Sequence, residues 1–345
     1  MQTNRAVKQS HCFQSKGDEA ECSSSGNLFM MAFGASQIFL SQLPSLHNIT
    51  WLSVVAAAMS FGYSFIGLCL GVVQWISHGE VRGSAAGAAL GSHGLVSAPA
   101  KAWLAFQALG NIAFAYAFAE VLIEIQDTLK SPPPENKTMK KATMYGIGLT
   151  TAFYLLLGCT GYAAFGDNAP GNIFSVSGFY KPFWLVDVAN LFIVIHLLGA
   201  YQVFAQPIFA FFEKWVATKW PDAKLIHSIY TIRLPFRDGR SLNLILSKLI
   251  LRSIFIVFTT LVAMLFPFFN AVLGLLGALA FWPLAVYFPV SMYMVQSKVA
   301  RGMPKWFLLH GLNFLCLAVS ILATVGSVAD IAENLAHARP FHTHS

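Results

Sequence analysis

Three carboxylates, Glu120, Glu124 and Asp127, close an apolar stretch long enough to cross a membrane. Glu120 and Glu124 are four residues apart, so a continuous helix would place them on one face. Two carboxylates on one helix face lie so near each other that they do not both ionise readily. Ionisable groups at membrane depth are functional by default. The spacing therefore predicts a proton acceptor, Glu124 before Glu120. The alternative is that Glu124 and Asp127 reach the membrane interface and pair with Lys130.

A later apolar stretch, residues 183–209, carries a second set of ionisable side chains. His196 stands near its middle and titrates in the physiological range. It is a candidate for proton coupling, or else a neutral histidine bonded to a helix neighbour. Asp187 and Asn190 would face one side of the same helix. Asp187 lies near one end and is a candidate gate or proton-entry residue.

Gly110 and Asn111 interrupt the apolar run 104–126 near its start. Glycine tolerates unusual backbone, and irregular backbone at membrane depth survives only inside protein or beside a cavity. The pair predicts a helix break whose free backbone groups bind a polar solute. The alternative is a packing notch between helices. Phe114 and Tyr116 would shape the pocket, or simply pack.

Composition places these residues in a membrane protein. Hydrophobic residues make up 56% of the chain, charged residues 11%, and the mean hydropathy is +0.60. Soluble domains carry roughly one charged residue in four. The formal charge of +7 does not indicate a nucleic-acid partner, because the basic residues form no stripe with interleaved aromatics. We expect an all-α polytopic protein with about eight transmembrane helices, near 28–44, 52–76, 104–126, 142–165, 183–209, 248–270, 272–295 and 306–328.

Lysine and arginine predict the orientation of these spans. The loops after spans one, three, five and seven hold fifteen of them, counting Lys248 and Arg252, and the remaining segments hold seven. The richer side is expected to be cytoplasmic, which leaves the segments 1–27 and 329–345 extracellular. Cys12 and Cys22 then lie outside, either as a disulfide or as exposed thiols.

Long runs of the chain carry a resemblance to one family. They are the runs FQALGNIAFAY (106–116), LIEIQD (122–127), KSPPPENKTMKKAT (130–143), GYAAFGD (161–167), HLLGAYQV (196–203) and GALAFWPL (277–284). In these runs the chain resembles the plant amino acid permeases of the amino acid/auxin permease family, which are proton-coupled carriers.

The resemblance implies a partial inverted-repeat transporter fold over 28–328. Family members usually have eleven spans, and this chain matches from after the third. Substrate would bind near mid-membrane, at discontinuous helices. On this chain the resemblance places that site at Gly110, Asn111, Phe114 and Tyr116, and many relatives have Asp at the position of Asn111.

The function that follows is amino acid:H+ symport across the plasma membrane. Protons are the coupling ion, with Glu124, Glu120, His196 and Asp187 as candidate carriers. No organic cofactor and no metal site is expected. An enzyme is disfavoured because the chain has no H-E-x-x-H motif and no histidine clusters. The alternative is a truncated, non-transporting fragment, or a regulatory partner of a full-length permease.

Overall fold

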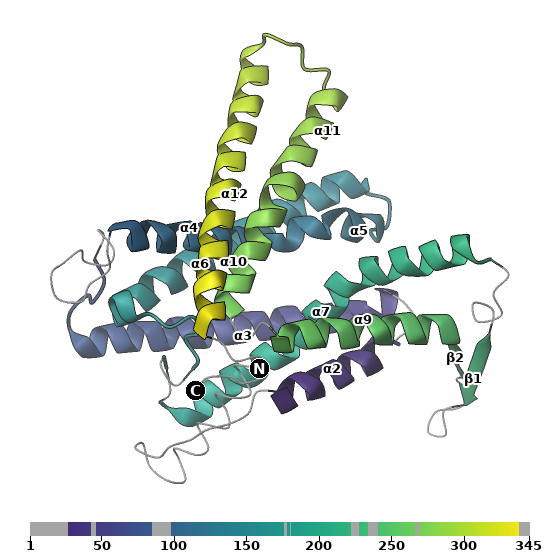
Figure 1. Cartoon of the computed structure of the whole chain (residues 1–345), viewed down its shortest axis with the longest axis horizontal. Coiled ribbons are helices and arrows are strands. Elements are labelled where there is room, and N and C mark those ends of the chain that lie inside the picture. The colour runs from purple at the N-terminus through teal and green to yellow at the C-terminus, as the bar shows by residue number, and fades with distance from the viewer. Residues whose placement is uncertain are drawn as a thin grey trace. The chain divides into compact units, whose positions relative to one another are not determined.

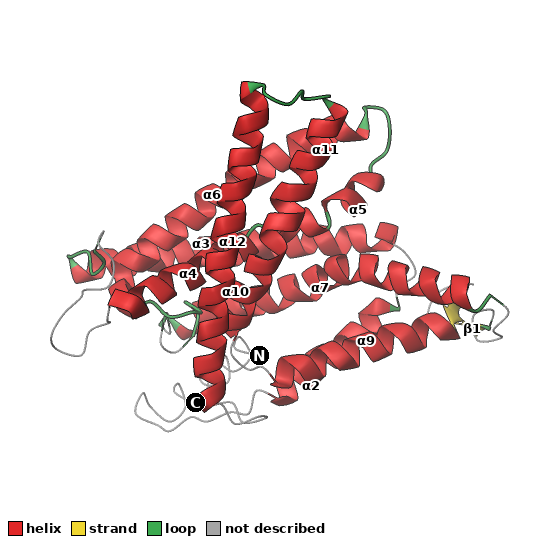
Figure 2. Cartoon of the chain, turned by 45° about the horizontal axis from the view of Figure 1, so that its top comes forward, coloured by secondary structure: helices red, strands yellow, loops and turns green. Residues whose placement is uncertain are grey.

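The structure is a computed structural model that describes residues 27–42, 46–84, 98–175, 178–179, 181–221, 228–233, 241–265 and 269–337. Cys12 and Cys22 lie outside these residues, so the proposed disulfide stays a prediction. The described chain is helical apart from one short hairpin (Figures 1 and 2). This confirms the expected all-α polytopic class.

Within the described residues, six helices are long and apolar enough to cross a membrane. The six spans are Trp51–His78, Glu135–Asn168, Phe183–Lys219, Leu246–Leu265, Ala271–Gln296 and Pro304–Glu333. The first lies within α3 (Leu46–His78), and the second covers α6 (Glu135–Phe165) and η2 (Gly166–Asn168). The third and fourth are α7 (Phe183–Lys219) and α9 (Leu246–Leu265), and the last lies within α12 (Pro304–His337). These correspond to six of the eight predicted spans.

The other two predicted spans differ from expectation. The first is α2 (Asn27–Ser41), whose 15 residues rise only about 22 Å. That is shorter than the roughly 30 Å of a bilayer core. The third, at 104–126, is no single helix, because α4 (Ala98–Phe114) ends before a 3-10 turn η1 (Ala117–Glu120) and a short α5 (Leu122–Asp127).

The described chain forms two compact units, and the division falls within α6. The first unit holds α2, α3, the later part of α6, α7 and α9. Here α3 packs along α7, and α2 lies beside α9 (Figure 1). The apolar core at one end of α7 contains Leu70, Phe174, Phe179, Val186 and Ala189, all buried.

Charged and polar groups join three helices of this unit near the other end of α7. Arg252 on α9 pairs with Glu213 on α7, with 2.8 Å between Nε and Oε1. Its guanidinium also donates to the backbone carbonyl of Ser41, at the end of α2. Lys248 lies 3.1 Å from the second Glu213 oxygen. Sequence reasoning treated Lys248 and Arg252 only as orientation signals and missed this cluster.

A hairpin precedes α9, where sequence analysis expected only a basic loop. Strand β1 (Ile229–Arg233) pairs antiparallel with β2 (Ser241–Ile245), with Ile229 opposite Ile245. Two strands alone are marginally stable in water. The hairpin therefore depends on its continuity with α9, which begins at the next residue.

The second unit is built on three helices, α4, α10 (Phe269–Ala280) and α12, each in contact with the other two (Figure 2). Ser320 on α12 donates to the carbonyl of Ala278, and Trp282 Nε1 donates to Asn313 Oδ1 at 2.7 Å. Asn313 and Ser320 are both buried. Because lipid offers no hydrogen-bond partners, these polar pairs fix how α12 lies on α10.

Candidate functional site

The interruption of the predicted third span is real, but it lies further along than expected. Helix α4 continues through Gly110 and Asn111 to Phe114. A turn at Ala115 and Tyr116 follows, and then η1. Tyr116 N–H donates to the Ala113 carbonyl at 3.2 Å, and Val121 N–H donates to Phe118 at 3.2 Å. These bonds span three residues, so the chain is wound more tightly than an α-helix here.

Gly110 does not break the helix because its role is close packing. A Cβ on Gly110 would overlap the carbonyl oxygen of Gly274 on α10. A Cβ on Gly277 would lie 2.5 Å from Phe114 N and 2.7 Å from Phe114 Cβ. These glycines let the backbones of α4 and α10 touch. The packing alternative therefore describes Gly110 in this structure, and Phe114 packs on the same seam.

The helix that faces this interruption is itself irregular. After Ala280 the chain enters a π-helical segment, η3 (Phe281–Tyr287), before α11 (Phe288–Gln296). Pro283 lies inside η3 and has no N–H to donate, so a regular hydrogen-bond ladder cannot pass through it. A proline that follows two closely spaced glycines favours a kink and close packing. The structure has both: wide turns at the proline and glycine contacts just before it.

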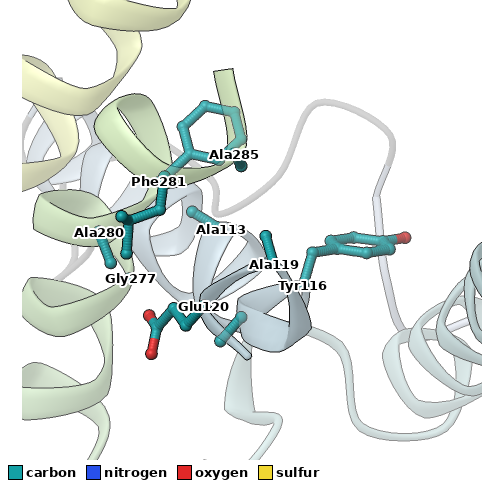
Figure 3. Close-up of a pocket in the computed structure, with 10 residues that line it drawn as sticks. Ala113, Tyr116, Ala119, Glu120, Gly277, Ala280, Phe281 and Ala285 are labelled. Atoms are coloured by element: carbon teal, nitrogen blue, oxygen red, sulfur yellow. The ribbon is translucent and has the colours of Figure 1, made fainter. Parts of the chain in front are cut away.

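The two irregular segments, η1 and η3, line one recess (Figure 3). Its interior volume is about 10 Å³, which is roughly the space of one water molecule, and it opens to solvent. The lining is Ala113, Tyr116, Ala117, Ala119, Glu120, Gly277, Ala280, Phe281, Leu284 and Ala285. Small side chains dominate it, and the Glu120 carboxylate is the one charged group among those ten. In Figure 3 the Tyr116 ring points away from Phe281, and Glu120 extends below Gly277. Small apolar side chains beside one carboxylate suit a solute that carries a hydrogen-bond donor, and the recess must widen before such a solute can enter.

The structure separates Glu120 from Glu124. Val121 interrupts the helix between them, with φ −112° and ψ 5°. The prediction that the two carboxylates share a regular helix face is therefore wrong, because the spacing argument assumed a continuous helix. All three carboxylates are exposed, but only Glu120 also lines the recess; Glu124 and Asp127 lie on α5.

Asn111 lies away from the recess, among polar groups that sequence reasoning missed. Its Oδ1 is buried without a hydrogen-bond partner in the described structure, and so is Ser327 Oγ on α12. Both atoms lie close to the position of a Cβ on Gly274, at 3.2 Å and 2.9 Å. One turn before Asn111, Gln107 donates to the Asp330 carboxylate. The available signal was the four-residue spacing of Gln107 and Asn111 inside an apolar run.

His196 and Asp187 lie on α7, in the other unit, and His196 is engaged by backbone. His196 Nδ1 lies 2.9 Å from the carbonyl oxygen of Ala56 on α3, so this nitrogen carries the proton and donates it. The Tyr63 ring meets the imidazole edge-on, with centroids 5.7 Å apart. The alternative weighed for His196, a histidine bonded to a helix neighbour, describes this geometry. Asp187 Oδ1 is buried with no hydrogen-bond partner in the described structure.

The membrane-length helices together with the paired irregular segments indicate a membrane carrier. Irregular backbone that lines a recess inside a helical membrane protein is typical of carriers.

Comparison with known proteins gives the family. Residues 3–332 match the family described as transmembrane amino acid transporter protein, and the chain belongs to that family. It is 53% identical to amino acid permease 4 of Arabidopsis thaliana over 339 residues, which are 98% of this chain and 72% of that protein. It is 52% identical to amino acid permease 2 of the same plant, over 97% of this chain and 67% of that protein. Lysine histidine transporter-like 1, also from Arabidopsis thaliana, is 29% identical over 88% of this chain and 61% of its own length. No solved structure matches this chain.

Proposed function

We propose that this protein carries amino acids across the plasma membrane together with protons. Family membership supports amino acid transport, and the names of the most similar relatives support the permease activity. The structural observation that carries the proposal is the recess between η1 and η3, where two irregular backbone segments meet beside one carboxylate. A truncated, inert fragment or a regulatory partner of a full-length permease is the less favoured function.

In this proposal the amino acid binds at the recess after η1 and η3 move apart and widen it. Tyr116 and Phe281 bound it, while the contact of Gly110 with α10 and the packing of Phe114 on Gly277 set its width. Asn111 acts from the neighbouring polar cluster around Gly274, adjusting how α4 lies on α10 and α12.

Proton coupling is assigned first to Glu120, because it lines the recess. A carboxylate there accepts a proton when the site faces the acidic side and loses it on the other side. Glu124, His196 and Asp187 remain candidate carriers. No organic cofactor or metal takes part in the proposed cycle. The protein is a multi-pass plasma membrane protein with both termini outside in this proposal.

The test is uptake of a labelled amino acid mixture into cells that express the chain, at several external pH values and with surface abundance measured. Amino acid permease 4 of Arabidopsis thaliana serves as the reference at matched abundance. We expect uptake to rise as external pH falls and Glu120→Gln to abolish that rise. Glu124→Gln, on the exposed face of α5, separates the two carboxylates: we expect it to keep most of the pH-dependent rise, and loss of the rise in this variant alone would move the coupling role to Glu124.

Normal surface abundance without uptake would overturn the transport proposal. Co-purification of the chain with the full-length reference, together with a change in the reference's uptake, would then identify it as a regulatory partner.

A further inference from the structure

Two buried oxygen atoms without partners lie one turn apart near the start of α7. Asp187 Oδ1 and Asn190 Oδ1 are both buried, and neither has a hydrogen-bond partner in the described structure. The residues are three apart on one helix, so their side chains are neighbours. Burying a polar atom without a partner destabilises a protein, and two such acceptors together call for a donor between them.

The orientation of Asn190 is fixed by its other contacts. Its Nδ2 donates to the carbonyl of Phe174 at 3.1 Å and to the carbonyl of Val186 at 3.1 Å. Because both partners can only accept, the amide cannot be turned around, and Oδ1 must be the free acceptor. The bond to Val186 draws the amide back over the preceding turn of α7, where Asp187 lies. Asn190 itself is fully buried.

Among the residues that the structure describes, no cationic side chain is paired with Asp187 Oδ1. Helix α3 contains no aspartate, glutamate, lysine or arginine, and neither does α2. The Lys248 and Arg252 side chains of α9 are bound to Glu213, near the other end of α7. Before α7, Asp167 accepts from Tyr162 Oη at 2.9 Å, and Lys181 Nζ lies 5.9 Å from the ring of Phe183. Arg82 follows α3 and its backbone N–H donates to Ala163; His196 is bound to Ala56.

We propose that Asp187 and Asn190 form a proton-binding pair. A proton from water binds the Asp187 carboxylate, and the resulting O–H donates to Asn190 Oδ1, so one proton supplies the missing donor for both oxygens. Asn190 is a positioning residue here: its Oδ1 accepts the hydrogen bond from protonated Asp187, while its Nδ2 donates to the Phe174 carbonyl. A role in transport rests on the proposed function, whereas proton binding by the pair does not.

The pair is tested first by infrared difference spectroscopy of the purified chain in lipid, between acidic and neutral pH. We expect a carbonyl band of a protonated carboxylic acid that is absent in Asp187→Asn and displaced in Asn190→Leu. Asp167→Asn, a carboxylate already bound by Tyr162, is the control and should leave the band unchanged. Other carboxylic acids, Glu120 among them, keep their own bands, so the proposal is overturned if Asp187→Asn loses no band that wild type shows.

Thermal unfolding gives a second readout that needs no transport. Proton binding to the folded state makes the wild-type midpoint rise as pH falls, and this contribution is lost as pH rises. The Asp187→Asn amide donates to Asn190 at every pH, so its midpoint should match wild type in acid and exceed it at neutral pH. Identical pH profiles for the two proteins would overturn the pair. If wild type shows the band but no uptake, the proposed function fails and the pair stands.

Discussion

At the scale of single residues, position in the tertiary structure decides which candidates matter. Gly110 and Phe114 meet the backbone of α10, Tyr116 and Glu120 line the recess, and His196 donates to Ala56 on α3. The residue types suggested chemistry for all of them. Their contacts divide them into packing residues, recess residues and one histidine held by backbone.

Gly277 provides the clearest test of the packing assignment. Gly277→Ala would put a methyl group 2.5 Å from Phe114 N, so either α4 or α10 must shift. Overpacking of this kind costs about 1–3 kcal/mol, and we expect a lower thermal midpoint and reduced uptake. Gly158→Ala in α6 is the matched control, because nothing lies within 4 Å of its Cβ position. An unchanged midpoint in Gly277→Ala would contradict the close backbone contact.

Arg252 is nearly buried, and its partners come from three parts of the chain. Glu213→Gln leaves the guanidinium without its carboxylate, and breaking a buried pair from one side costs about 3–5 kcal/mol. The double variant Glu213→Leu with Arg252→Met should lose less, because the one charge left without its partner is Lys248, whose side chain is 45% exposed. Thermal unfolding of the three proteins measures this difference. A single variant as stable as the double would show that the pair contributes little.

At the scale of elements, the sequence identified helices well and irregular segments poorly. Six predicted spans are helices of membrane length, since apolar length alone decides that outcome. The helix break appears at Ala115 instead of Gly110, because Gly110 is held inside α4 by its contact with α10. The apolar pattern of a sequence does not report which backbones touch in the folded chain. The π-helical turns of η3 also had no signal beyond Pro283.

Pro283 connects this irregularity to the recess. Pro283→Ala restores a backbone N–H, so α10 and α11 can join in a regular helix. We expect the thermal midpoint to hold or rise while amino acid uptake falls, because the lining at Phe281 and Leu284 turns away from η1. Uptake that falls only in proportion to surface abundance would argue against a functional role for η3.

At the scale of the whole molecule, the distribution of lysine and arginine predicts which loops face the cytoplasm. A membrane-impermeant thiol reagent tests it, with single cysteines introduced into a chain whose five native cysteines are replaced. Asp167→Cys should react in intact cells, because the 166–182 segment is predicted to be outside. Lys137→Cys should react only after the membrane is opened. The reverse pattern would invert the topology.

The sequence by itself determined the all-helical membrane class, six of the spans and the resemblance that the family match confirms. These depend on composition, apolar length and long ordered motifs, all of which are local. Only the tertiary structure decided that Glu120 and not Glu124 lines a recess, that Gly110 packs instead of breaking its helix, and that Asp187 and Asn190 each bury an unpaired oxygen. Those outcomes depend on which backbone groups of distant segments meet, and side-chain spacing along one helix carries no information about that.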